Sequence, residues 1–169
     1  MVAVKNRTSK PEYEICTLDN VVLLAWRAPP VIQGVNTCDA AFAAIRATEP
    51  NRKIGFLTYV EPAAQQGSPT PQVRTALANM LKSYEKHIRA TVIVYEGSGF
   101  KATIVRSVVT AINLASSLKF ASLVAAERGT GVTWLFDKMQ GETEASPADL
   151  LRVLRDLPSP PAPNVALYG

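Results

Sequence analysis

The chain has 169 residues, of which 47% are hydrophobic, and it carries a formal net charge of +4. This length argues against two domains, and the hydrophobic content excludes a disordered chain. The two cysteines, Cys16 and Cys38, are isolated, which favours free thiols in a reducing compartment. The first ten residues lack the apolar stretch of a signal peptide, and no apolar run reaches membrane-spanning length, so we expect a cytoplasmic location.

The basic residues are dispersed along the chain. Their main local concentration is Lys5, Arg7 and Lys10, in a polar segment with no aromatic residue. Nucleic-acid-binding proteins usually gather Lys and Arg on one face, with aromatic residues between them. We therefore expect no nucleic-acid partner and interpret residues 1–11 as a flexible, solubilising arm. The alternative is a weak contact of these basic residues with phosphate groups or a membrane surface.

The first elements of the domain form a predicted hairpin. Polar and apolar residues alternate over 12–18, and residues 21–26 are a strongly apolar strand. The Asp19-Asn20 pair between them is typical of a two-residue hairpin turn.

The later elements alternate between helices and strands, as the period of the apolar residues and the Pro and Gly breaks indicate. We expect a helix over 36–48 capped by Asn36 or Thr37, a strand over 53–60, a helix from Thr70-Pro71 to Ile88, a strand over 90–95, an unusually apolar helix over 100–118, a strand over 120–126, a brief helix over 133–139, and a helix over 147–157 that begins at Ser146-Pro147.

This order, β-β-α-β-α-β-α-β-α, predicts an α/β fold with a mixed, mostly parallel sheet of about five strands. We expect one domain over residues 12–157. Residues 158–169 are rich in proline and are expected to form an extended tail.

A glycine-rich turn, Gly97-Ser98-Gly99, follows a predicted strand and opens the apolar helix. With Lys101 and Ala102 it matches G-x-G-x-x-A, a pattern that cradles a pyrophosphate at a helix N-terminus, with Glu127 near the place of the ribose-binding acid. The alternatives are another anion, phosphorylation of Ser98, or an ordinary tight turn. We take Gly97, Ser98, Gly99 and Lys101 as the candidate binding or modification site.

The side chains do not form a recognisable catalytic motif. His87 is the single histidine, and the sequence has no G-x-S-x-G elbow, Walker lysine motif or H-E-x-x-H. We therefore expect no catalytic residue, no metal and no cofactor.

Three aromatic residues are candidates for a pocket that takes an apolar small molecule: Trp26, Trp134 and Phe100. The alternative is that the two tryptophans pack in the core, because each lies in an apolar segment.

The sequence resembles a known family in the order and spacing of these segments. The hairpin is followed by Gly-Phe-Leu-Thr-Tyr-Val, a helix ending at His87-Ile88, Val-Ile-Val-Tyr-Glu-Gly-Ser-Gly-Phe, the apolar helix, and a strand leading to Thr133-Trp134-Leu135. Over residues 12–139 this pattern is similar to bacterial STAS-like proteins, the group related to the sporulation anti-anti-sigma factor and to CRAL-TRIO lipid carriers.

The resemblance implies a domain that is not an enzyme and that binds a protein partner or, in some members, a small ligand. In anti-anti-sigma members a serine in a D-S-S-G-type turn is phosphorylated by a partner kinase. The nearest match here is Ser98, where Glu96-Gly97 replaces Asp-Ser and the turn follows the fourth predicted strand instead of the third.

From these observations we expect a regulatory, protein-interaction module. A homodimer through the 100–118 helix or an edge strand is one form of that interaction. Two alternatives remain: a carrier of an apolar small molecule or lipid, and a nucleotide-binding protein or enzyme that uses the Gly97-Ser98-Gly99 turn.

Overall fold

The strands lie side by side in the order in which they occur along the chain. A computed structural model describes residues 1–96 and 118–157, and its sheet has six strands in the order β1-β2-β3-β4-β5-β6. The first two pairings are antiparallel and the next three are parallel. The elements are β1 (Val4–Ser9), β2 (Tyr13–Leu18), β3 (Val21–Trp26), α1 (Ile32–Thr48), β4 (Ile54–Val60), the 3-10 helix η1 (Pro62–Gln66), α2 (Pro71–Ser83), β5 (Ile88–Tyr95), β6 (Ala121–Ala125), α4 (Arg128–Lys138) and α5 (Pro147–Arg155).

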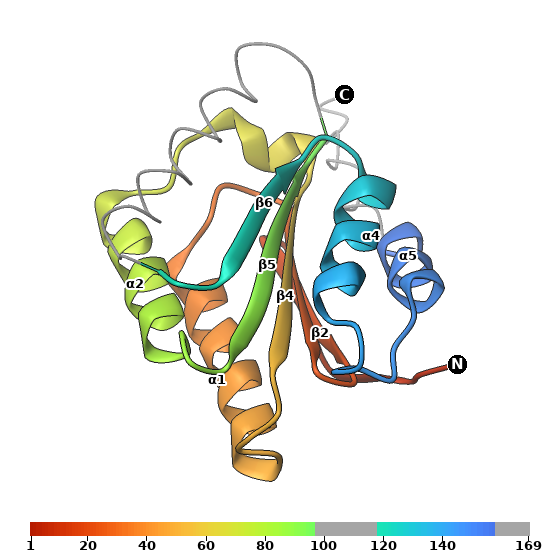
Figure 1. Cartoon of the computed structure of the whole chain (residues 1–169). Helices are drawn as coiled ribbons and strands as arrows, with labels where there is room; N and C mark the ends of the chain where they lie inside the picture. The colour runs from red at the N-terminus through yellow and green to blue at the C-terminus, as the bar shows by residue number, and fades with distance from the viewer. Residues whose placement is uncertain (97–117, 158–169) are drawn as a thin grey trace, which may run out of the picture.

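The topology places the described helices on both faces of the sheet. α1 connects β3 to β4, and α2 connects β4 to β5. Such connections between parallel strands are right-handed, and both step the same way across the sheet, so α1 and α2 lie on the same face. After β6 the chain returns over the other face as α4 and α5 (Figure 1). The result is a three-layer α/β arrangement with the sheet in the middle.

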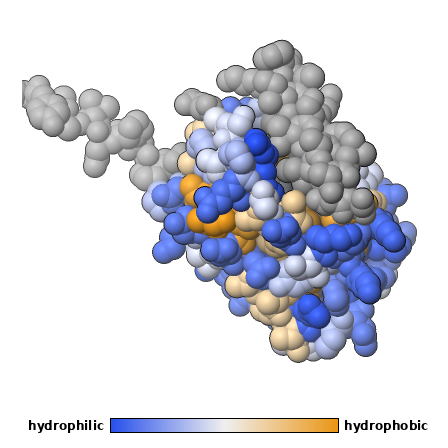
Figure 2. Space-filling view, turned by 90° about the vertical axis from the view of Figure 1, so that its left-hand side faces the viewer, coloured by the Kyte–Doolittle hydropathy of each residue, from blue (hydrophilic) through white to orange (hydrophobic). Residues whose placement is uncertain are grey.

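The core accordingly consists of two clusters separated by the sheet. Along β3, Val22, Leu24 and Trp26 belong to the cluster under α1 and α2, and the alternate residues of the strand belong to the cluster under α4 and α5. Figure 2 shows the α1 and α2 side, where hydrophilic residues cover most of the surface drawn in colour. Among the helices that the structure describes, none has the length and hydropathy required to cross a membrane.

The general α/β class and the mixed sheet are as predicted, but the sheet has one strand more than the five expected. The additional strand is β1, in the segment interpreted as a flexible arm, and it pairs with β2. Its sequence, VKNRTS, has no apolar alternation because β1 is an edge strand and most of its side chains are exposed. The predicted helix over 100–118 lies outside the described residues.

Two helices begin earlier than predicted. α1 starts at Ile32, so Thr37 lies within the helix, where its hydroxyl donates to the Gln33 carbonyl at 2.9 Å. α4 starts at Arg128 and includes Gly131, whose position lies so close to the sheet that a Cβ would be 2.7 Å from Val94 Cγ2. A glycine usually indicates a turn in a sequence, but Gly131 is required because α4 packs closely against β5 at this position.

Two helix starts agree with the sequence. The Thr70 hydroxyl accepts from the Val73 N–H at 3.3 Å, with Pro71 in the first turn of α2. Ser146 and Asp149 form a capping box at the start of α5.

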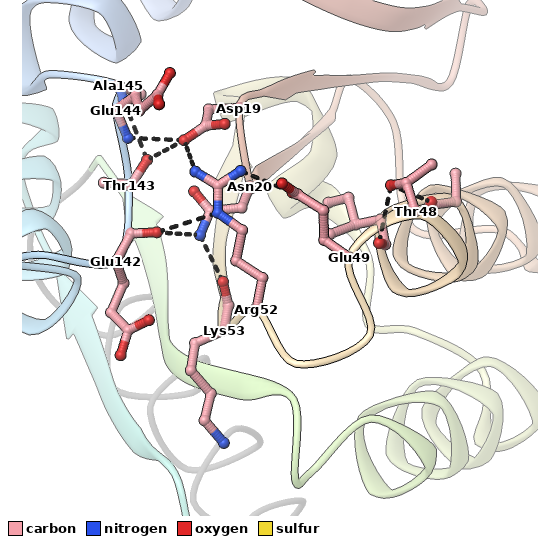
Figure 3. Close-up of polar contacts among 12 residues, drawn as sticks. Asp19, Asn20, Thr48, Glu49, Arg52, Lys53, Glu142, Thr143, Glu144 and Ala145 are labelled. Atoms are coloured by element: carbon pink, nitrogen blue, oxygen red, sulfur yellow. Dashed lines mark hydrogen bonds and ion pairs between the residues drawn. The ribbon is translucent and has the colours of Figure 1, made fainter.

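Polar contacts at one end of the sheet join three loops (Figure 3). The Asp19 carboxylate, in the β2–β3 turn, accepts from the Arg52 guanidinium, from the Glu144 N–H at 2.7 Å and from the Thr143 hydroxyl at 3.1 Å. Burial raises the pKa of Asp19, but these hydrogen bonds and the charge of Arg52 outweigh it and lower the pKa below its usual value. Asn20 lies beside Asp19 and is fully buried. The cluster fixes the end of the sheet at which the parallel strands begin.

The Gly34→Ala substitution is expected to lower the free energy of unfolding by about 1–3 kcal/mol, as overpacking does. The new methyl group would overlap the Trp26 ring and lie 3.1 Å from Tyr13 Cδ1. Gly129→Ala in α4 is the matched control, because nothing beyond its chain neighbours and the adjacent helix backbone lies within 4 Å of its Cβ position. Urea unfolding measures both, and equal stability of the two variants would contradict the prediction.

Candidate functional site

Charged residues directly follow three neighbouring parallel strands. The register pairs Trp26 with Val60 and Val60 with Tyr95, so the next residues, Arg27, Glu61 and Glu96, form a row along one edge of the sheet. This is the carboxyl edge, at which open α/β sheets usually bind their ligands. We call Arg27, Glu61 and Glu96 the carboxyl-edge row.

Glu96 is held by side chains from three elements. Its carboxylate accepts from the Tyr59 hydroxyl at 3.0 Å and from Arg128 Nε and a terminal Arg128 nitrogen at 2.5 and 3.2 Å. Its backbone carbonyl accepts from Gln65 Nε2 at 3.2 Å. The Arg128 guanidinium also lies 5.2 Å from the centre of the Tyr59 ring. These hydrogen bonds hold the Glu96 side chain in one position at the end of β5.

The pKa values of Tyr59 and Arg128 are shifted in the directions that favour their hydrogen bonds to Glu96. Burial raises the pKa of Tyr59 to about 12, and the Glu96 carboxylate contributes to the rise. The hydrogen bonds to Glu96 raise the pKa of Arg128. The Tyr59 phenol therefore stays protonated and Arg128 stays charged at neutral pH, although the side chains of Arg128 and Glu96 remain 39% and 30% exposed.

The other end of the row contains a buried ion pair. Arg27 donates to Glu14, whose second oxygen accepts from Arg7 Nε at 2.6 Å. Arg27 also donates to the Lys10 carbonyl at 3.0 Å, and its Nε lies 4.0 Å from Glu61 Oε1. Burial raises the pKa of Glu61, the charge of Arg27 opposes the rise, and the Glu14 carboxylate adds to it. Arg27 thus links β1 and β2 to the row.

Comparisons with protein-family models, with curated proteins and with solved structures found no match. The resemblance to STAS-like proteins therefore remains a prediction from the sequence.

The candidate residues of the glycine-rich turn lie outside the described residues. These are Gly97, Ser98, Gly99, Phe100 and Lys101. Glu96, in the carboxyl-edge row, is the residue immediately before them in the sequence. Glu127, the candidate ribose ligand, is exposed at the residue before α4.

The structure does not bring the two candidate pocket tryptophans together. Trp26 is 2% exposed and packs against Tyr13 in the cluster under α1 and α2. Trp134 is half-buried against the other cluster, on the α4 side of the sheet. The sheet separates them, so they do not line one pocket.

The remaining reactive side chains are distant from the row or buried. His87 lies between α2 and β5, at the opposite edge of the sheet. Burial raises the pKa of Cys16 to about 12 and also raises that of Cys38, so both thiols stay protonated. Within residues 1–96 and 118–157, no group of three His, Cys, Asp or Glu side chains is placed to hold a metal ion.

Sequence reasoning did not identify Arg27, Glu61 or Arg128 as site residues. The available signal was a charged residue directly after each of three apolar strands. The sequence alone does not show that these charged residues are neighbours, because this depends on the register of β3, β4 and β5.

Proposed function

We propose that the chain is a regulatory, protein-interaction module of the STAS-like kind, and that a partner protein docks at the carboxyl-edge row. The observation that carries this proposal is the fixation of Glu96 by Tyr59, Gln65 and Arg128. It supplies a rigid, partly exposed group of charges at the edge where such folds bind.

The composition of this edge suits a protein surface. Arg and Tyr are enriched among the residues that dominate binding energy, and side chains that are already ordered lose less entropy on docking. Glu96 of the row and the adjoining Arg128 present one negative and one positive group, both partly exposed, which favours a partner with complementary charges. Paired carboxylates and a protonated phenol support recognition more than proton transfer.

A site-specific photo-crosslinker tests the proposal. Benzoylphenylalanine at position 127, an exposed position beside Arg128, is expected to form an adduct of discrete mass in an extract of the source cells. The same group at position 51, exposed at the opposite edge, is the positional control. Peptide sequencing of the adduct distinguishes a different partner from a second copy of this chain.

Competition then tests whether the adduct depends on Arg128, which pairs with Glu96 of the row. Unlabelled Arg128→Gln chain is expected to compete at least about tenfold less well than the unchanged chain, the loss typical of a central interface arginine. Arg155→Gln, in an exposed arginine of α5, should compete normally. Adducts of equal yield from both positions, or full competition by Arg128→Gln, would overturn the proposal.

A further inference from the structure

A groove with a concentration of positive charge lies at the opposite edge of the sheet, where β5 and β6 begin. Its cavity has a volume of about 550 Å³. Five cationic residues line it, together with one acidic residue: Lys53, Lys86, Arg89, Lys119 and Lys138, and Glu85. They come from four separate parts of the chain, and the fold alone brings them together. We call this the basic groove.

Among the described residues, the five cations form no ion pairs. Lys53 Nζ donates to the Lys86 carbonyl at 2.5 Å, and Arg89 Nε donates to the Lys138 carbonyl at 3.1 Å, so both bind uncharged groups. In the part of the chain that the structure describes, no carboxylate lies within 4.0 Å of any of the five charged groups. Residues 97–117 and 158–169 contain no Asp or Glu side chain.

The one acidic residue of the groove is already engaged. The Glu85 carboxylate accepts from Lys82 Nζ at 2.8 Å and from the Lys119 N–H at 3.0 Å. The Lys82 hydrogen bond lowers the pKa of Glu85, and Lys119 contributes to the decrease. The negative charge of Glu85 is therefore paired mainly with Lys82, which is not one of the five cations of the groove. The groove keeps an excess of positive charge.

The neighbouring histidine lies in the positive potential of the same part of the surface. Burial lowers the pKa of His87, and the charges of Arg46, Lys53 and Lys86 lower it further. Two of these three cations line the groove. An anionic ligand would relieve the repulsion that they exert on one another.

The size and lining of the groove indicate the class of ligand. A cavity of this volume accommodates a small molecule. Lysine ammonium groups bind phosphate oxygens as point charges, and the half-buried Phe120 adds an apolar part for an organic group. The cations surround one concavity, whereas an extended nucleic acid would need a longer cationic track with exposed aromatic residues. We infer that the basic groove binds a compact small molecule carrying two or more phosphate groups.

Isothermal titration with inorganic tripolyphosphate tests this inference in low-salt buffer. The unchanged chain is expected to bind one tripolyphosphate, and Lys86→Ala/Lys119→Ala, which removes two exposed cations, should weaken binding at least tenfold. The matched control, Lys5→Ala/Lys10→Ala, removes the same charge from two exposed lysines beside the far edge of the sheet and should bind normally. Urea unfolding of both variants verifies that they remain folded.

Three results would overturn the inference. These are the lack of a saturable site for tripolyphosphate, an equal loss of binding in the two double variants, and tight binding of a single-stranded oligonucleotide that tripolyphosphate does not displace. The last result would identify the groove as a nucleic-acid surface. The crosslinking experiment concerns the opposite edge of the sheet, so the two proposals can fail separately.

Discussion

The Arg27→Met substitution is expected to lower the free energy of unfolding by about 3–5 kcal/mol, the usual cost of breaking a buried ion pair. The side chain of Arg27 is 7% exposed and that of its partner, Glu14, is 1% exposed. The variant would leave the Glu14 carboxylate with Arg7, whose side chain is 47% exposed, as its remaining charged partner. It would also remove the hydrogen bond to the Lys10 carbonyl, which attaches the segment after β1.

A double variant separates the cost of an unpaired charge from the value of the pair. Glu14→Leu/Arg27→Met removes both charges, and we expect it to be more stable than Arg27→Met, because hydrophobic replacement of a whole buried pair is often neutral. Urea unfolding at pH 7 gives the double-mutant cycle. Arg155→Met, which breaks an exposed pair with Asp156, should change stability by less than about 1 kcal/mol and serves as the control. Additive losses at Glu14 and Arg27 would contradict this explanation.

The elements that sequence patterns predicted are those whose signals are local. The Asp19-Asn20 turn joins strands already marked by apolar residues, and Thr70 and Ser146 cap helices through hydrogen bonds within four residues. β1 lacked such a signal because its pairing depends on a partner strand and on the Arg7 contact with Glu14. The start of α4 was missed because the need for Gly131 arises from the distant residue Val94.

The candidate site depends even more on tertiary structure. Glu61 and Glu96 are separated by a 3-10 helix, a helix and a strand, and only the β4–β5 register places them side by side. Likewise, Lys53 and Lys138 show no relation in sequence but line one groove. Scattered basic residues in a sequence therefore do not exclude a local concentration of charge on the surface.

Asn20 provides the sharpest test of how the loops at the amino edge are held together. Its side chain is fully buried, and Nδ2 donates to the Lys53 carbonyl at 2.5 Å and to the Glu142 carbonyl at 2.7 Å (Figure 3). The two carbonyls belong to the α1–β4 and α4–α5 loops. One amide group therefore joins the β2–β3 turn to loops from both faces of the sheet.

The Asn20→Asp substitution keeps the shape of the side chain but replaces the donor with an acceptor. At pH 7 the introduced carboxylate would face two carbonyl oxygens without a proton, and we expect a loss of about 3–5 kcal/mol in urea unfolding. Asn51→Asp, at an exposed position in the neighbouring loop, should change stability by less than about 0.5 kcal/mol.

The pH dependence distinguishes electrostatic repulsion from a change in packing. The site disfavours the charged form, so the introduced carboxyl has a higher pKa in the folded state than in the unfolded state. Its cost is therefore smallest below the unfolded pKa and grows as the pH rises through the folded pKa. The stability difference between Asn20→Asp and the unchanged chain should accordingly be smaller at pH 4 than at pH 7. A difference that stays constant over this range would contradict repulsion between the introduced carboxylate and the two carbonyl oxygens as the cause of the loss.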